Sequence, residues 1–128
     1  MTKIIEDSIV PILKKSLANE NFRDTVITGK MCQVVLMTLQ PGEEIGAEVH
    51  EDHDQILVLT EGNGQAVLEG EARQVGTNDL IFVHAGVEHN FINTGSRALK
   101  LYTVYAPPEH AEGTRHATKA EADQAEEH

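Results

Sequence analysis

The 128-residue chain has no tryptophan, and aromatic residues make up only 4% of it. Its core must therefore be built from valine, isoleucine and leucine, a bias that favours strands over helices. Basic residues are also few, since 10 lysines and arginines stand against 21 aspartates and glutamates and leave a formal charge of −11. A surface this acidic repels phosphate backbones and anionic lipid headgroups, so we expect neither nucleic acid nor membrane partners.

Cysteine occurs once, as Cys32, which excludes an intrachain disulfide and gives no sign of an oxidising compartment. The residue lies beside the apolar run Val34–Leu36, so we expect it to be a buried small hydrophobe rather than a nucleophile. The N-terminus lacks the apolar stretch of a signal peptide, and no run is long enough for a membrane span. We therefore expect a cytoplasmic protein.

Apolar runs of strand length recur from residue 25 onward, separated by Gly, Pro, Asn and Asp. Short strands with frequent turn signals and no convincing central helix predict an all-β sandwich or barrel, which we place at residues 25–108. The predicted strands are Cys32–Leu39, Gln55–Thr60, Gln65–Glu69, Ala72–Val75, Leu80–Val83, Asn90–Ile92 and Ala98–Tyr105.

The N-terminal extension, residues 1–24, has the pattern of a short helix that runs through Leu17. Ser8 is a suitable N-cap, and a proline is tolerated in the first turn, where Pro11 lies. The apolar residues that this helix places on one face are Ile9, Leu13 and Leu17.

The C-terminal segment, residues 109–128, is polar. Thr118 and Glu121 form a possible capping box ahead of a stretch rich in alanine and glutamate. A short helix against the barrel and a solvated tail are both consistent with this composition.

Histidine is unusually frequent, with seven residues in the chain, and two of the seven lie in regularly spaced segments. In the first segment, Gly42, Glu48, His50, Gln55 and Gly62 are separated by five, one, four and six residues. Glu48 and His50 stand two positions apart, so in an extended chain both point to one face. Gln55 places a polar group at the start of an otherwise apolar strand.

The second segment runs from Asn78 to Asn93. It contains a predicted strand, then the turn His84-Ala85-Gly86, and then His89 after two further residues. Three residues separate His89 from the closing asparagine.

These spacings resemble the two conserved motifs of the cupin superfamily. The family's first motif is Gly, five residues, His-x-His, three or four residues, Glu, six residues and Gly. Its second motif is Gly, five residues, Pro-x-Gly, two residues, His, three residues and Asn. The match covers about residues 40–95 and keeps every interval. The flanks also look like those of small single-domain bacterial cupins, namely Asn21-Phe22-Arg23, Thr28-Gly29-Lys30 and Tyr102–Thr118, which contains Ala106-Pro107-Pro108-Glu109-His110.

The resemblance implies a double-stranded β-helix, or jelly-roll barrel, with one divalent metal ion at four ligand positions. Carried over residue by residue, these positions are Glu48, His50, Gln55 and His89. Glu48 replaces the family's first His and Gln55 replaces its Glu, so the set keeps one carboxylate. Two imidazoles and a carboxylate match the facial triad of non-haem iron sites. The oxygen donors soften the preference for copper and zinc and move it toward iron, manganese or nickel, so the candidate ions are iron, manganese, nickel and zinc.

The other histidines have less defined roles. His84 stands where the family motif has its turn proline, so we interpret it as a turn residue. We expect His53 on a solvated loop, with an alternative role as a ligand. We also expect His110 and His116 to be solvated, unless the tail folds over the barrel mouth and offers an acid/base group there.

The sequence predicts a metal-binding cupin and leaves its reaction open. One hypothesis is a metal-dependent enzyme, a dioxygenase or an isomerase or epimerase, acting on a small oxygen-rich metabolite inside the barrel. The alternatives are a metal- or ligand-binding module without turnover and a structural homodimer with a vestigial site. We expect a homodimer under all three hypotheses, because Cys32–Leu39 and Ala98–Tyr105 carry apolar residues on both faces.

Overall fold

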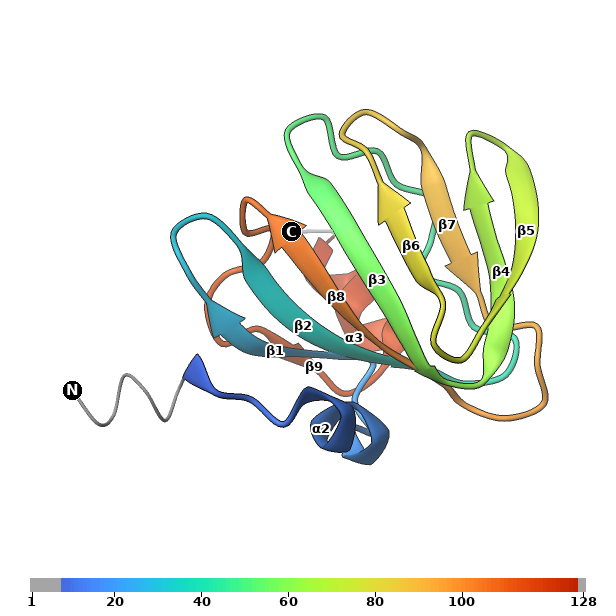
Figure 1. Ribbon diagram of the computed structural model, residues 1–128, viewed down its shortest axis with the longest axis horizontal. Coiled ribbons are helices and arrows are strands. Elements are labelled where there is room, and N and C mark those ends of the chain that lie inside the picture. The colour runs from blue at the N-terminus through green and yellow to red at the C-terminus, as the bar shows by residue number, and fades with distance from the viewer. Residues whose placement is uncertain (1–7, 127–128) are drawn as a thin grey trace.

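The computed structural model describes residues 8–126, which form two antiparallel sheets and two short helices (Figure 1). The elements are α2 (Ile12–Ala18), β1 (Arg23–Thr28), β2 (Gln33–Leu39), β3 (Asp54–Glu61), β4 (Asn63–Leu68), β5 (Glu71–Gly76), β6 (Leu80–Val83), β7 (His89–Ile92), β8 (Leu99–Ala106), β9 (Arg115–His116) and α3 (Lys119–Glu126). The larger sheet has the order β6-β3-β8-β2-β1-β9, and the smaller has the order β5-β4-β7. The predicted all-β jelly roll is confirmed.

The core lies between the two sheets and is mostly aliphatic. Alternate residues of β2, β3 and β8 face inward, such as Met37, Leu57 and Leu101, each of which is fully buried. Ala66 of β4 and Phe91 of β7 complete the cluster from the smaller sheet. An interior of this kind leaves any polar side chain within it in need of a partner.

The C-terminal segment completes the larger sheet instead of leaving the barrel as a solvated tail. β9 pairs with β1 through Arg23↔His116 and Asp24↔Arg115. Neither strand was predicted, because β1 mixes charged and apolar residues and β9 has two residues, too few for a pattern. The sheet therefore begins at Arg23, two residues before the predicted start of the barrel, and includes residues beyond its predicted end at residue 108.

The capping box predicted ahead of α3 forms as a variant, in which the reciprocal bond goes to Ala117, the residue before the Thr118 cap. The Glu121 N–H donates to the Thr118 hydroxyl (3.1 Å), and the Glu121 carboxylate accepts from the Ala117 N–H (2.7 Å). Ala122 of the helix is buried in the core, so this segment adopts the packed-helix alternative.

The N-terminal helix differs from its prediction in both start and orientation. It begins after Pro11, because proline disfavours helical geometry in the residue before it. Its predicted apolar face is exposed, with Ile9, Leu13 and Leu17 at 72%, 55% and 39%. The helix instead packs on the barrel through buried Ser16, whose hydroxyl lies 2.7 Å from that of Thr60. Neither helix of residues 8–126 combines the length and apolar character needed to cross a membrane.

The expectation for Cys32 is also wrong, because its side chain is exposed. Cys32 belongs to the turn before β2, where its carbonyl accepts a hydrogen bond from the Gly29 N–H (2.9 Å). The inward-facing alternation begins one residue later, with buried Gln33.

The residues that close the two motifs are structural. Gly62 has a φ of +95°, and a Cβ there would lie 2.8 Å from the Ala98 carbonyl oxygen, so a side chain does not fit. Asn93 is buried, and its amide donates to the carbonyls of Leu39 and Arg97, both at 2.9 Å. Its Oδ1 accepts from the Gly95 N–H, also at 2.9 Å. Asn93 thus joins the end of β2 to the turn that leads into β8.

We predict that Asn93→Ala lowers the free energy of unfolding by about 2–3 kcal/mol, because it leaves buried backbone groups without partners. Urea denaturation would measure this. Ser96→Ala, an exposed change in the same turn, is the control and is expected to stay within about 0.5 kcal/mol of the parent. Equal unfolding midpoints for the parent and Asn93→Ala would contradict the assignment.

Candidate metal centre

A main-chain pairing brings Glu48 and His89 together. The two residues form an isolated antiparallel bridge beside β7, in which each N–H donates to the other's carbonyl at 2.9 Å. Directly opposed residues of an antiparallel pair point to the same face. The backbone therefore places the Glu48 carboxylate next to the His89 imidazole.

His50 joins this pair because the chain is extended, as the spacing predicts. Val49, between Glu48 and His50, points outward and is 44% exposed, whereas both of its neighbours turn inward and are partly buried. The His50 carbonyl also accepts a hydrogen bond from the Gly86 N–H (2.9 Å). This contact joins the first motif to the turn of the second.

That turn accounts for His84. The Val87 N–H donates to the His84 carbonyl (3.1 Å), and Gly86 takes a φ of +86°, which favours glycine at this turn position. The His84 side chain is exposed. The structure thus places His84 in the turn, as interpreted from its motif position.

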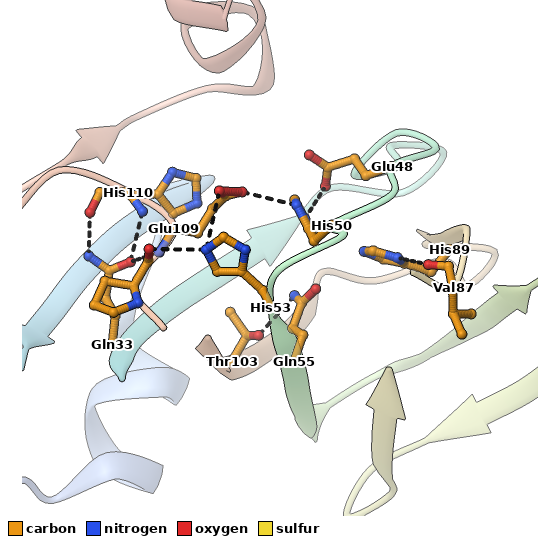
Figure 2. Close-up of polar contacts among 11 residues, drawn as sticks. Gln33, Glu48, His50, His53, Gln55, Val87, His89, Thr103, Glu109 and His110 are labelled. Atoms are coloured by element: carbon orange, nitrogen blue, oxygen red, sulfur yellow. Dashed lines mark hydrogen bonds and ion pairs between the residues drawn. The ribbon is translucent and has the colours of Figure 1, made fainter. Parts of the chain in front are cut away.

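The possible ligand atoms of Glu48, His50 and His89 all lie within 4.8 Å of one another. His50 Nε2 is 3.8 Å from Glu48 Oε1, and the centroids of the two imidazole rings are 5.2 Å apart. Figure 2 shows the side chain of Gln55, buried on β3, rising toward the two rings. The structure brings three of the four predicted ligand positions into one cluster, with Gln55 beneath them.

Three buried atoms at this cluster have no hydrogen-bond partner within the part of the chain that the structure describes. They are His50 Nε2, His89 Nε2 and Gln55 Oε1. Buried polar atoms without partners are uncommon, and each is costly unless a water or an ion satisfies it. All three are good donors for a divalent metal, so the residues present fit such an ion.

In each imidazole, a hydrogen bond to Nδ1 explains why Nε2 is the nitrogen that remains able to bind a metal. His89 Nδ1 lies 2.9 Å from the Val87 carbonyl oxygen, which can only accept, so Nδ1 carries the proton. In a neutral imidazole the lone pair is then on Nε2. His50 has the same arrangement, because its Nδ1 lies 3.0 Å from a carboxylate oxygen of Glu109.

Gln55 is oriented by a hydroxyl. The Thr103 hydroxyl donates its one proton to the Ile56 carbonyl (2.9 Å) and so can only accept from Gln55. The Gln55 amide nitrogen donates to it at 3.0 Å. The amide is therefore fixed with its oxygen on the other side, free for a metal.

Sequence reasoning missed Glu109 and Gln33. The Glu109 carboxylate accepts from His50, and the Gln33 amide binds the backbone of Glu109 and His110 (Figure 2). Glu109 lies outside both motifs, and the resemblance of the flank Ala106–His110 to small cupins was its one signal. Gln33 gave no signal, since it stands alone at the start of an apolar run.

The expectation that His53, His110 and His116 are solvated is wrong. His53 Nε2 donates to the Pro108 carbonyl (3.1 Å), and its side chain is only 18% exposed. The His110 ring packs edge-on against Tyr105, with centroids 5.3 Å apart. His116 Nδ1 accepts from the Arg23 guanidinium (3.2 Å). The tail folds onto the barrel, which was the alternative left open.

The barrel and its histidine-rich interior define the class of protein. A cupin domain model matches residues 35–105, and the chain belongs to this family. The resemblance to small bacterial cupins is confirmed.

Three known proteins resemble this chain over most of its length. YrkC of Bacillus subtilis is 45% identical over 125 residues, which span 92% of this chain and 67% of YrkC. The crystal structure of BH2720 from Bacillus halodurans is 41% identical with a TM-score of 0.89, over 91% of this chain and 92% of that one. TT1209 from Thermus thermophilus is 25% identical with a TM-score of 0.70, over 77% of this chain and 96% of that one.

The environment of His110 makes stability depend on pH. Burial, followed by the positive charge of Arg23 and the nearby histidines, lowers the pKa of His110 from 6.5 to about 3. The unfolded chain takes up this proton near pH 6.5 and the folded chain only near pH 3. The stabilising contribution is therefore complete above pH 6.5 and is lost progressively down to about pH 3.

We predict that His110→Phe, which keeps an aromatic ring against Tyr105 but cannot titrate, flattens the fall in unfolding free energy between pH 6.5 and pH 3. Urea denaturation at several pH values would measure the slope. His84→Phe is the matched control, because His84 is exposed, and it should keep the parent's slope. A His110→Phe slope equal to the parent's would show that other groups cause the acid sensitivity.

Proposed function

We propose that this chain binds one divalent metal ion inside the cupin barrel through Glu48, His50, Gln55 and His89. We further propose that it uses this ion to act on a small, oxygen-rich metabolite. The observation that carries the proposal is the group of buried, unpartnered ligand atoms: His50 Nε2, His89 Nε2 and Gln55 Oε1. Buried atoms of this kind need a water or an ion to satisfy them, and one divalent ion would take up the lone pairs of all three.

The donor set favours particular metals. Two neutral imidazoles, one amide oxygen and one carboxylate suit iron, manganese or nickel better than copper. When bound, such an ion polarises a carbonyl or, if it is redox-active, supports chemistry with oxygen. The chain's own contribution is to hold four donors, of which one carries charge, in a largely water-excluded interior.

Two features support an active site over a closed structural one. The Glu48 side chain is 29% exposed, so the cluster has a side open to solvent through which a small molecule can approach. His53 adds a partly exposed imidazole whose ring centroid lies 5.7 Å from that of His50. Because Nε2 donates to the Pro108 carbonyl, a neutral His53 carries its lone pair on Nδ1, the atom that would accept a proton from a substrate.

We predict that the protein binds one equivalent of Fe(II), Mn(II) or Ni(II) and that both His89→Ala and Glu48→Gln weaken binding at least tenfold, or by about 1.4 kcal/mol. The first variant removes a donor, and the second removes the charge of the set. Titration calorimetry and elemental analysis of protein purified without a chelating column would test this. His84→Ala is the control and should bind as the parent does. A parent that binds none of these ions would overturn the proposal.

We also propose that the chain forms a homodimer through the outer face of the larger sheet. Phe82 of β6 pairs with Ile56 of β3, and Ile56 pairs with Val104 of β8. Paired residues share a face, so these side chains form a continuous apolar band. Leu80 and Phe82 are 59% and 41% exposed at one end of it. An exposed apolar band of this kind is typical of an association surface, and a second copy presents the same band in a self-complementary way.

We predict that Phe82→Asp converts a dimer into a monomer, because it buries a charge in the apolar interface. Sedimentation at micromolar concentration would show this. Met31→Asp, an equal change at a residue that is 77% exposed on the β1–β2 loop, should leave the dimer intact. A monomeric parent would contradict the proposal.

A further inference from the structure

We infer that Glu109 is a positioning residue for the metal site: held in place by Gln33, its carboxylate fixes the ring orientation and the tautomer of His50. The inference rests on the proposed metal-binding function, although one of its tests does not. Glu109 lies beyond the residues that match the family model, which end at 105.

The contact between Glu109 and His50 has a defined direction. Glu109 Oε2 lies 3.0 Å from His50 Nδ1, and an ionised carboxylate can only accept a hydrogen bond. Nδ1 must therefore carry a proton, and a neutral His50 ring presents its lone pair on Nε2. A hydrogen bond to a charged acceptor is also stronger than one to a neutral acceptor. Without it, the ring would exchange its proton between two nitrogens and would lose the hydrogen bond that orients it.

Gln33 holds Glu109 in reach of His50. Its Oε1 accepts from the N–H groups of Glu109 (3.2 Å) and His110 (3.0 Å), and its Nε2 donates to the His110 carbonyl (2.7 Å). A second donation from the same nitrogen, to the Thr28 hydroxyl (2.9 Å), fixes the amide. The fully buried Gln33 side chain thus binds the segment after Pro108 much as a neighbouring strand would.

The strand register places Gln33, whose amide holds Glu109, in line with the proposed ligand Gln55. Gln33 of β2 is paired with Tyr105 of β8, and Tyr105 is paired with Gln55 of β3. The three side chains form one row across the inner face of the larger sheet. The amide that clamps Glu109 and the amide proposed to bind the metal therefore occupy the two ends of the same row.

A second metal site is the competing interpretation. His50, His53 and Glu109 also have possible ligand atoms within 4.8 Å of one another. However, His50 Nδ1 donates to Glu109, and His53 Nε2 donates to the Pro108 carbonyl (3.1 Å). An ion there would require both nitrogens to give up their protons and His50 to bridge two metals. The observed contacts favour a hydrogen-bonded support for a single ion.

The first experiment reads the tautomer of His50 directly, in metal-free protein, from long-range ¹H–¹⁵N correlation spectra of the imidazole. The parent is expected to show the proton on Nδ1, whereas Glu109→Ala is expected to show a mixture of tautomers. Glu112→Ala removes an equal charge from an exposed position three residues further along the same segment, and it should give the parent's spectrum. A role in folding alone would leave the tautomer unchanged.

The second experiment measures affinity for Mn(II) or Ni(II). We expect Glu109→Ala to weaken binding about 10- to 100-fold, the range usual for residues that support a ligand. Glu109→Gln should lose less, because an amide oxygen still accepts from Nδ1 but carries no charge. Gln33→Leu, which keeps the volume and removes the clamp, should resemble Glu109→Ala, and Glu112→Ala should match the parent.

The outcomes separate the two proposals. If the parent binds no metal but its His50 tautomer depends on Glu109, the proposed function fails, and the effect of Glu109 on the His50 ring stands without it. If the parent binds one ion while Glu109→Ala keeps both its tautomer and its affinity, the positioning role fails alone. Two ions per chain, one of which is lost in both Glu109→Ala and His53→Ala, would replace the inference with the second metal site.

Discussion

Three of the four proposed ligand groups, His50, Gln55 and His89, have two polar atoms each, and a hydrogen bond to one of them determines what the other can do. The Val87 carbonyl does this for His89, the Thr103 hydroxyl for Gln55 and the Glu109 carboxylate for His50. Each partner comes from a different element: the turn before β7, the strand β8 and the segment after it. The proposed site is therefore oriented from several sides by the chain itself, an arrangement that would lower the cost of ordering the ligands when an ion binds.

Strand pairing sets the positions of the proposed ligands, and the turn before β7 and the segment after β8 supply hydrogen-bond partners for two of them. The Glu48–His89 bridge sets the distance between carboxylate and imidazole through the main chain alone. Strand register places Gln33, Tyr105 and Gln55 in one row, which forms another side of the proposed site. A one-residue slip in β3 would turn Gln55 outward and bring Ile56 into the site, so the apolar outer face and the polar inner site enforce the same register.

Much of this arrangement could be predicted from the sequence, because its determinants are local. Motif spacing, through its resemblance to cupins, marked the four proposed ligand positions, and apolar runs between turn residues marked most strands. The contact between Gln33 and Glu109 spans 76 residues and depends on how the tail returns to β2, so no local pattern encodes it. The N-terminal helix shows a different limit: its apolar stripe was identified, but periodicity cannot say whether such a stripe meets its own barrel or another surface.

Both edges of the larger sheet are short. β6 has four residues at one edge, and β9 has two at the other, beside an ion pair between Arg115 and Asp24 (3.2 Å). The register of β1 also shifts between Thr25 and Ile27, which twists the strand along the part of its length that β9 does not cover. An open edge with unpaired backbone groups would act as a template for strand addition by other chains. The larger sheet, which presents an apolar face to its surroundings, is therefore protected against strand addition along its two edges.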